Sequence, residues 1–321
     1  MPVQQLTERV WYFYGGANCG LILGDERDAV LVDSGLDAGN ARKLWRPWQE
    51  QGWRLAGIVN THSHTDHIGG NADVQKRTGA LAYVPPPEHL LVEYPEFEPQ
   101  GLFGGVQPPP TLQVKFLLAA PSRVGGLIQP GRNRIGSVEF EAIPIPGHSP
   151  AQVGVAAGDV LFVADGCFRP EVLARHPITY MVDVAGFLDS LGVIGARPEA
   201  IIVPGHGPAF DRRTGADLPG SEGDRSLPAG PEGDPLPALL AANRASVQQL
   251  LDLCRAALTM PASTESVLAH VVAALGKVHD NDPSYFLDRA AVHACLSHLT
   301  HKGELTVRFA DGNRVWLRTG A

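Results

Sequence analysis

Hydrophobic residues in the first part of the chain recur in short runs that predict β-strands. Two apolar runs, Leu21–Leu23 and Ala29–Val32, flank a polar turn and predict a hairpin. The stretch AGNARKLWRPWQEQG has apolar residues at helical spacing, and we expect this helix to stop at Gly52. Ile58–Val59 predicts a short buried strand, and the stretch GGNADVQKRTG predicts a helix with Gly79 just past its end. Strands that alternate with helices indicate an α/β arrangement.

The regular pattern is interrupted twice. Residues 85–130 are rich in Pro and Gly and also contain Tyr94, Phe97 and Phe103. The aromatic residues favour an ordered segment, which we expect to pack over a site or against a second subunit. Residues 212–237 are dominated by Gly, Pro, Asp, Glu and Ser, and this composition predicts a linker.

The last part of the chain has a helical character. Three stretches carry apolar residues at helical spacing; Ser263 is a candidate N-cap for the second, and Pro283 suits the first turn of the third. An alternating segment with a turn at Asp311-Gly312 then predicts a terminal hairpin. We therefore predict an α/β catalytic domain over 1–211, a linker over 212–237 and a small, mostly helical, winged-helix-like domain over 238–321.

Composition and charge narrow the classes of function. The chain has 321 residues, 44% of them hydrophobic, and a formal net charge of -8, which does not favour nucleic acid or an anionic membrane as partner. Its 4 cysteines are scattered without C-x-x-C spacing, so we expect buried or free thiols in a reducing compartment. The sequence shows no signal-peptide pattern and no apolar run of the roughly 18–20 residues that span a bilayer. A cytoplasmic protein is the expectation.

The segment THSHTDHIGG, residues 61–70, concentrates four metal-binding side chains. His62 and His64 lie two residues apart after a strand, so their side chains point the same way. Asp66 and His67 lie on the following turn and face another direction. Imidazole and carboxylate ligands suit Zn²⁺ and also Fe or Mn. One catalytic zinc needs three protein ligands, so four here, with others elsewhere, imply two metal ions.

Three further candidates follow apolar runs later in the chain: His148, Asp165 and His206. Each lies beside a glycine, so the backbone can turn sharply and present the side chain at a sheet edge. Asp165 is the natural bridge, because a carboxylate has two oxygens. A lone His148 or His206 would more often be a surface or core residue, but the ordered set leaves little room for coincidence. No ligand role is assigned to the remaining histidines, His89, His176, His270, His279, His293, His298 and His301.

These motifs together resemble the metallo-β-lactamase superfamily. The resemblance rests on THSHTDHIGG, PGHS, VADG and PGHG, with LVDSG upstream, and covers roughly residues 8–210. It implies a four-layer αβ/βα sandwich with a dinuclear site at one edge. By this resemblance His62, His64 and His148 bind one metal, Asp66, His67 and His206 bind the other, Asp165 bridges the two, and Asp33 supports the metal loop from behind.

The full ligand set is similar to that of glyoxalase II, other thioesterases, lactonases and RNA-processing members. We expect a hydrolase in which two divalent ions, zinc before Fe or Mn, activate a shared water for attack on a small ester, thioester or lactone. Asp66 is the candidate catalytic residue, orienting the nucleophile. Arg169, His176 and Tyr180, which follow Asp165, are candidates for substrate contact.

Three alternatives stay open. An RNA-cleaving nuclease ranks second, since residues 239–321 carry 8 Lys and Arg against 7 Asp and Glu and lack a dense basic face. A mononuclear iron persulfide dioxygenase is less favoured because the PGHG motif around His206 is intact. A non-catalytic binding module would have lost ligands, whereas all seven are present. The expected partner is a small molecule and not a membrane; the oligomeric state is left open.

Overall fold

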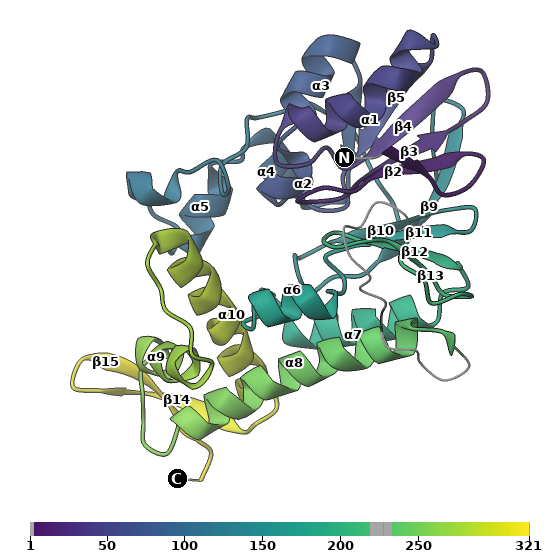
Figure 1. The fold of residues 1–321 in the computed structure, drawn as a ribbon. Helices are drawn as coiled ribbons and strands as arrows, with labels where there is room; N and C mark the ends of the chain where they lie inside the picture. Colours follow the sequence, from purple (N-terminus) through teal and green to yellow (C-terminus); the bar gives the residue numbers. More distant parts are fainter. Residues whose placement is uncertain (1–2, 219–226, 228–232, 321) are drawn as a thin grey trace.

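Two β-sheets form the centre of the protein, whose computed structural model describes residues 3–218, 227 and 233–320 (Figure 1). The first sheet has the order β1-β2-β3-β4-β5-β6-β7. Its strands are β1 (Val3–Gln5), β2 (Val10–Phe13), β3 (Cys19–Leu23), β4 (Asp28–Val32), β5 (Arg54–Val59), β6 (Leu81–Val84) and β7 (Val124–Leu127). Strands β1 to β4 pair antiparallel, which confirms the predicted hairpin, and β4 to β7 pair parallel.

The second sheet has the order β13-β12-β11-β10-β9-β8. Its strands are β8 (Gly131–Ile135), β9 (Val138–Pro144), β10 (Val153–Ala157), β11 (Val160–Ala164), β12 (Ile201–Pro204) and β13 (Phe210–Asp211). Strands β11 and β12 pair parallel and the other neighbours pair antiparallel. Strands β10 to β12 are buried along their whole length, as sheets covered on both faces require.

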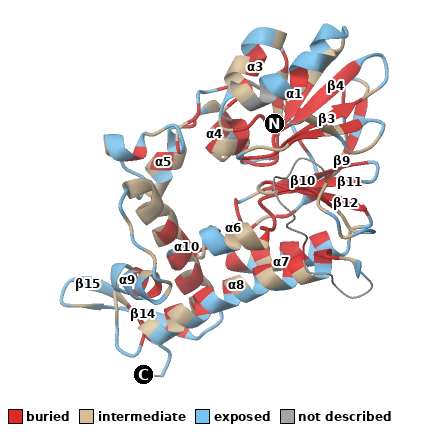
Figure 2. Ribbon diagram, viewed as in Figure 1, coloured by how far each residue is buried: buried red, intermediate tan, exposed pale blue. Residues whose placement is uncertain are grey.

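Helices cover the outer face of each sheet and complete four layers. Helices α1 (Ala38–Glu50) and α3 (Asn71–Thr78) lie on the first sheet, where Trp45 and Val74 join its core. Gly79 ends α3 in a left-handed conformation, as predicted. Helix α7 (Val184–Gly195) lies on the second sheet through Phe187. A third cluster, containing Val30 and Phe162, fills the space between the sheets. Much of the length of the strands in both sheets is buried (Figure 2).

Beyond these layers the chain continues into helices α8 (Leu236–Ala257), α9 (Thr264–Ala274) and α10 (Asp282–His301), then the hairpin β14 (Leu305–Ala310) and β15 (Asn313–Arg318). Ser263 caps α9 by accepting a hydrogen bond from the Ser266 N–H, and Ala262 forms a β-bridge with Trp316. The three predicted helices and the hairpin are confirmed. That they form a winged helix stays a prediction.

One hydrophobic cluster runs from the second sheet into this helical region. It includes Leu161 of β11, Phe187 of α7, Leu250 of α8 and Leu296 of α10. Helix α8 begins at Leu236, within the residues predicted as linker. Most of that linker, residues 219–226 and 228–232, lies outside the described residues. The division into 1–211, 212–237 and 238–321 stays a prediction.

The segment 85–130 is ordered as short helices, α4 (His89–Glu93), α5 (Phe97–Leu102) and the 3-10 turn η1 (Pro110–Leu112), before β7. It packs against α10, where the rings of Phe103 and Phe286 lie 5.3 Å apart and Thr111 donates a hydrogen bond to Asp282. Glu98, Phe116 and Leu117 from this segment also reach the cavity described below. Of the two placements expected for this segment, the structure shows the first, over the site.

No helix within the described ranges is both long and apolar enough to cross a membrane. All four cysteines are buried and reduced, as expected.

Candidate metal centre

Five of the seven predicted ligands follow β-strands, two lie on a short helix, and all seven converge on one edge of the sandwich. His62 and His64 follow β5, and Asp66 and His67 lie on the short helix α2 (Thr65–Ile68). The other three, His148, Asp165 and His206, follow β9, β11 and β12. Side chains up to 144 positions apart in the sequence, His62 to His206, thus share one site.

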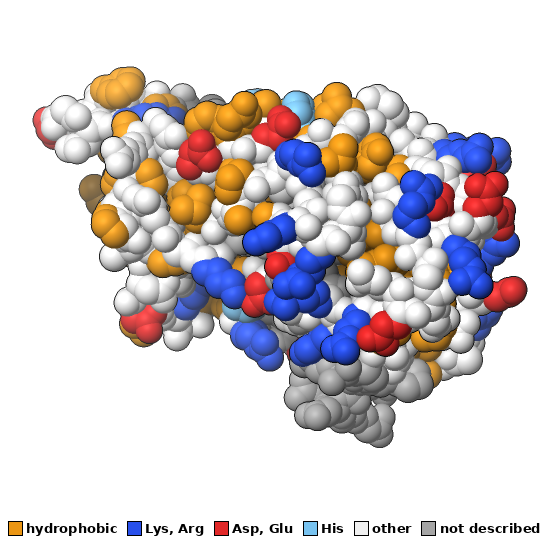
Figure 3. Space-filling model, turned by 90° about the horizontal axis from the view of Figure 1, so that it is seen from above, with side chains coloured by type: hydrophobic (Ala, Val, Ile, Leu, Met, Phe, Trp, Pro, Cys, Tyr) orange, Lys and Arg blue, Asp and Glu red, His pale blue; other side chains and the backbone are white. Residues whose placement is uncertain are grey.

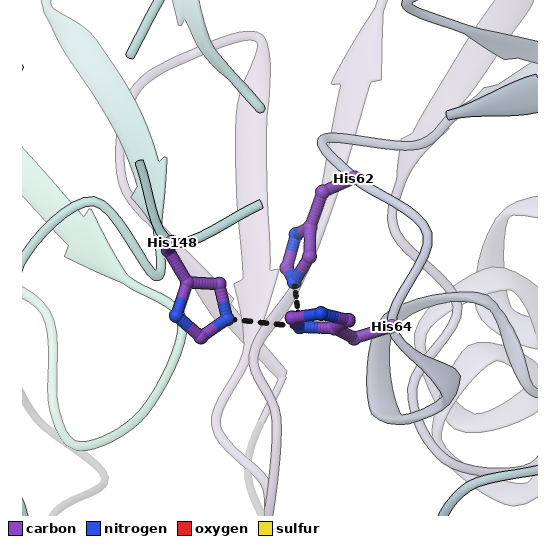
Figure 4. Close-up of side chains that lie close together, drawn as sticks. All are labelled: His62, His64 and His148. Carbon is purple, nitrogen blue, oxygen red and sulfur yellow. Dashed lines mark hydrogen bonds between the residues drawn. The ribbon is translucent and has the colours of Figure 1, made fainter. Parts of the chain in front are cut away.

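Three histidines form the first group of ligand atoms. His64 Nδ1 lies 3.1 Å from His62 Nε2 and 2.9 Å from His148 Nε2, so three imidazole nitrogens meet at one point (Figure 4). His62 is fully buried and His148 is 5% exposed. This arrangement matches the three-histidine set that the sequence predicted for one metal.

Asp66, His67 and His206 form the second group. His206 Nε2 lies 3.2 Å from Asp66 Oδ2, and His67 Nε2 lies 4.0 Å from the same oxygen. Asp165 contacts both groups: its Oδ2 lies 3.3 Å from His148 Nε2 and 3.4 Å from His206 Nε2, and its Oδ1 lies 3.5 Å from His67 Nε2. The carboxylate expected to bridge therefore lies between the two groups.

Oxygen acceptors behind the rings orient most of these histidines. The Nδ1 of His148 lies 3.0 Å from the carbonyl oxygen of Tyr180, and the Nδ1 of His206 lies 2.5 Å from that of Gly16. A carbonyl oxygen only accepts, so each Nδ1 carries a proton, and in the neutral imidazole each Nε2 presents a lone pair to the site. Such partners fix the tautomer that a metal needs.

Asp33 orients two more histidines. Its Oδ2 accepts from His67 Nδ1 at 2.8 Å and from the hydroxyl of Thr61 at 2.8 Å, and that hydroxyl oxygen lies 3.1 Å from His62 Nδ1. The Thr61 N–H donates to Asp33 Oδ1 at 2.9 Å. Asp33 thus contacts the metal loop from behind, at the place the resemblance implies.

Burial and neighbouring charge set the protonation of the site. Burial holds the pKa of His62 well below its usual value and lowers the pKa of His148 to about 3. Burial also acts on His67 and His206, but adjacent carboxylates outweigh it and raise the pKa of both well above the usual range. The first group therefore presents neutral imidazoles, and carboxylates compensate positive charge at the second.

Whether a metal fits can be judged from two buried atoms of this site. Neither has a hydrogen-bond partner among the described residues. They are His67 Nε2 and Asp165 Oδ1, which face each other at 3.5 Å. A buried polar atom left without a partner destabilises the fold by about 1–3 kcal/mol. Nitrogen and oxygen donors that lack other partners are what a divalent cation would satisfy, so the residues fit the group.

Close backbone packing holds Asp165 in place. Ala164, which precedes it, has φ 44°, a conformation that non-glycine residues rarely adopt. Gly205 lies so close that a Cβ there would sit 2.0 Å from Asp165 Oδ1. The PGHG glycine before His206 is therefore needed because a side chain would occupy the space of the carboxylate.

A cavity of about 550 Å³ opens onto these ligands. His64, Asp66, His148, Asp165 and His206 line it, together with apolar residues from several elements: Phe116, Leu117, Phe168, Ile178 and Leu287. Glu98 also lines it, and burial raises the pKa of this carboxyl well above its usual value. Lys277 and Asp288 from the C-terminal region form part of the wall.

Two of the three residues predicted to contact the substrate line the cavity, and one does not. His176 and Tyr180 line the cavity. Arg169 does not: its side chain is 1% exposed, and its guanidinium donates to both oxygens of Asp217 at 2.7 and 2.9 Å. Arg169 therefore stabilises the fold beneath the cavity, and its prediction as a substrate contact is corrected.

Three polar residues near the site escaped the sequence analysis. Glu88 contacts the loops of His62 and His148, as described below. The Asn18 side chain donates to the carbonyls of Pro204 and Gly207 on either side of His206, at 2.8 and 2.7 Å. Asn243 of α8 binds the backbone of Phe168, near Asp165. Each is a single polar residue without a motif around it, so no sequence signal distinguished it.

Comparison with sequence profiles of protein families identifies the family of the chain. The profile described as Metallo-beta-lactamase superfamily matches residues 13–206, more than half of the chain. The chain belongs to the metallo-beta-lactamase superfamily. The resemblance seen in the motifs is confirmed, and the described residues include His and Asp groups that could hold divalent metal.

Relatives in this superfamily include a Bacillus subtilis protein named probable metallo-hydrolase YqgX. It is 26% identical over 211 residues, which cover 63% of this chain and 90% of that protein. A hydroxyacylglutathione hydrolase of Xanthomonas axonopodis pv. citri is 27% identical over 148 residues, covering 46% of this chain and 45% of the enzyme. The match thus spans less than half of the hydroxyacylglutathione hydrolase.

Solved structures share the fold over nearly the whole chain. The crystal structure of a beta-lactamase domain protein from Burkholderia ambifaria superposes with a TM-score of 0.69 at 19% identity, covering 99% of this chain and 93% of that one. The predicted four-layer fold with a helical C-terminal region is confirmed. With its His and Asp groups, the chain is a member of a superfamily of metal-dependent hydrolases.

Proposed function

We propose that the chain is a hydrolase with two divalent metal ions, zinc in first place, that acts on a small ester, thioester or lactone. The observation that carries this proposal is that two groups of ligand atoms share Asp165 where the cavity opens. His62, His64 and His148 would hold one ion, Asp66, His67 and His206 the other, and Asp165 both.

Bound there, the two ions would lower the pKa of a water molecule and stabilise negative charge that develops on the substrate. Asp66 is the residue best placed to orient the nucleophile and accept its proton, since it lines the cavity and its side chain is 18% exposed. The Tyr180 carbonyl and Asp33 hold His148 and His67 in the tautomer that binding requires. Phe116, Phe168 and Ile178 form an apolar part of the cavity wall that the acyl group of the substrate would contact.

The dimensions of the cavity support a small substrate. Its volume of about 550 Å³ falls within the roughly 300–1,000 Å³ of small-molecule sites. On the face drawn in Figure 3, Lys and Arg side chains are interspersed with Asp and Glu and form no continuous basic surface. A nucleic acid backbone would favour such a surface, so RNA stays the second candidate. A cytoplasmic location also remains a prediction.

Metal analysis tests the first part of the proposal. We expect about two metal ions per purified chain, as the two-cation chemistry requires. A chain without metal, whose His62→Ala variant retains the full activity of the wild type, would overturn the assignment.

A substrate panel tests the second part. We expect hydrolysis of S-acyl thioesters, esters or lactones, lost in Asp66→Ala and retained in Asp73→Ala, which removes a half-buried carboxylate paired with Arg77. Cleavage of RNA alone would contradict the proposal, and oxygen consumption with a glutathione persulfide would indicate the oxidative alternative.

A further inference from the structure

The carboxylate of Glu88 joins the two loops that carry the three-histidine group. From the loop after β5, both the N–H and the hydroxyl of Ser63 donate to its Oε2, the N–H at 3.2 Å. From the loop after β9, the hydroxyl of Ser149 and the N–H of Ala151 donate to its Oε1 at 2.7 and 2.9 Å. Each oxygen thus serves one loop.

These contacts lie next to the ligands themselves. Ser63 stands between His62 and His64, and Ser149 directly follows His148. The loops are far apart in the sequence, and Glu88 lies on neither of them, preceding α4 in the Pro-rich segment. Its position therefore sets how far the first two histidines stand from the third.

Because Glu88 is buried, its carboxylate depends on the hydrogen bonds from the two loops. Glu88 is 1% exposed. Removing a carboxylate from water is costly unless hydrogen bonds replace its hydration. Four donors from the two loops supply that compensation, and hydrogen bonds to a charged acceptor are about twice as strong as neutral ones. Displacement of either loop would leave a buried oxygen of Glu88 without its donors.

We propose that Glu88 is a positioning residue for the metal site formed by His62, His64 and His148. This inference rests on the proposed metal-dependent function. Glu88 holds the two loops at the separation that lets three imidazole nitrogens meet. The second group takes Asp66 and His67 from α2 and His206 from the loop after β12, which Glu88 does not contact through these hydrogen bonds. Loss of Glu88 therefore weakens one site selectively.

The test measures Zn²⁺ affinity of the metal-free full chain by competition with a chromophoric chelator. Glu88→Gln keeps the size of the side chain, but its amide nitrogen cannot accept the hydrogen bonds of one loop. We expect one of two binding steps to weaken by about 10–100-fold, the range for partners that orient metal ligands. His148→Ala and His206→Ala identify the steps, and Glu88→Gln should affect the step that His148→Ala removes.

Asp28→Asn is the matched control. Asp28 is also a buried carboxylate, 3% exposed, but it binds Arg54 and the Ser137 N–H away from the site. We expect Asp28→Asn to lower the melting temperature while both Zn²⁺ affinities stay within about twofold of the wild type, less than the effect expected when a ligand partner is lost.

The results distinguish failure of the inference about Glu88 from failure of the proposed function. If the wild type binds two Zn²⁺ and Glu88→Gln binds both equally well, the role of Glu88 is overturned and the proposed function stands. If Asp28→Asn weakens the same step, the effect is general and the inference also fails. If the wild type binds no metal, the proposed function itself falls, and the inference with it.

A second variant covers the case in which Glu88→Gln does not fold. Ser149→Ala removes the hydroxyl contact to one loop and leaves the carboxylate and the Ala151 contact in place. We expect the same binding step to weaken, by a smaller factor than in Glu88→Gln. Wild-type affinity at both steps in Ser149→Ala would overturn the inference.

Discussion

In four histidines of this site, the Nδ1 nitrogen points away from the other ligand atoms and donates its proton to an oxygen acceptor. Asp33 holds the Nδ1 proton of His67 directly and that of His62 through the hydroxyl of Thr61. Backbone carbonyls do the same for His148 and His206. In the neutral imidazole each Nε2 then offers a lone pair, so residues that do not line the ligand groups orient them toward a cation.

Among single residues, we expect Asp66 to be required for hydrolysis. We expect Asp66→Ala to lower kcat by about 100-fold or more, since positioned proton acceptors contribute about that much and the side chain also belongs to the second ligand group. Steady-state kinetics on the most active thioester checks this. Asp73→Ala, which removes a half-buried carboxylate of helix α3, should leave kcat unchanged. Equal kcat in both variants would remove Asp66 from the mechanism.

Gly205 should be equally sensitive for a purely steric reason. A Cβ at this position would lie 2.0 Å from Asp165 Oδ1, so Gly205→Ala must displace the shared carboxylate. We expect metal affinity to fall by about 10–100-fold, as when a partner that orients a ligand is lost. Metal content after dialysis measures this. Gly101→Ala is the control, because a Cβ at that position would have nothing within 4 Å of it.

Between elements, helix α8 is tied to the loop that follows Asp165. The side chain of Asn243 accepts from the Phe168 N–H at 2.8 Å and donates to the Phe168 carbonyl at 2.8 Å. The Phe168 ring in turn lies 5.7 Å from the ring of His148. A helix of the C-terminal region thus fixes a residue that contacts a predicted ligand.

Asn243→Ala leaves the buried N–H and carbonyl of Phe168 without these bonds. We expect the free energy of unfolding to fall by about 1–3 kcal/mol, the cost of an unsatisfied buried group. Urea denaturation of the metal-free protein measures the change. Gln248→Ala, which alters an exposed position of the same helix, should change stability by less than about 0.5 kcal/mol. The role of Asn243 is contradicted if the two variants unfold alike.

The elements themselves were largely predictable. The hairpin β3–β4, helices α1 and α3, the end of α3 at Gly79 and the cap of α9 at Ser263 follow from periodicity and local turn chemistry. Helix α7 was not recognised, nor were strands β6 to β8 and the short helices α4 to α6. Apart from α7 they are short, and tertiary packing stabilises them more than local propensity does.

At the scale of the whole molecule, the cavity is assembled from distant parts of the chain. The metal loops form one side, the Pro-rich segment supplies Glu98 and Leu117, and the C-terminal region supplies Lys277 and Asp288. The ammonium of Lys277 lies 2.5 Å from Asp288 Oδ2, which holds it at the wall. The C-terminal region is therefore part of the wall of the cavity that opens onto the candidate metal centre.

Lys277→Gln should reveal whether that wall recognises charge. For a thioester that carries a carboxylate, we expect KM to rise about tenfold, or about 1.4 kcal/mol of binding, with kcat unchanged. A neutral thioester should show no change. Lys302→Gln removes an exposed cation and serves as control. If Lys277→Gln changes the KM of the charged and the neutral thioester by the same factor relative to the wild type, an electrostatic role is excluded.

Metal removal should destabilise the entire fold. Ligands that bind only the native state stabilise it by about 2.7 kcal/mol when present at 100 times their Kd. We therefore expect chelation to lower the melting temperature, measured by calorimetry, and added Zn²⁺ to restore it. An identical melting temperature with and without metal would contradict binding to the folded chain.

The sequence by itself determined the predicted ligand set, because its motifs follow short hydrophobic runs that predict strands, and such runs are visible in local hydrophobic patterns. It also determined the hairpin β3–β4, strand β5 and helices α1 and α3 of the sandwich, but not helix α7. Only the tertiary structure decided the roles of Glu88, Asn243 and the cavity wall, and removed Arg169 from the substrate contacts. These depend on partners dozens of residues away, with no periodic relation to them, so their meaning arises only when packing brings the partners together.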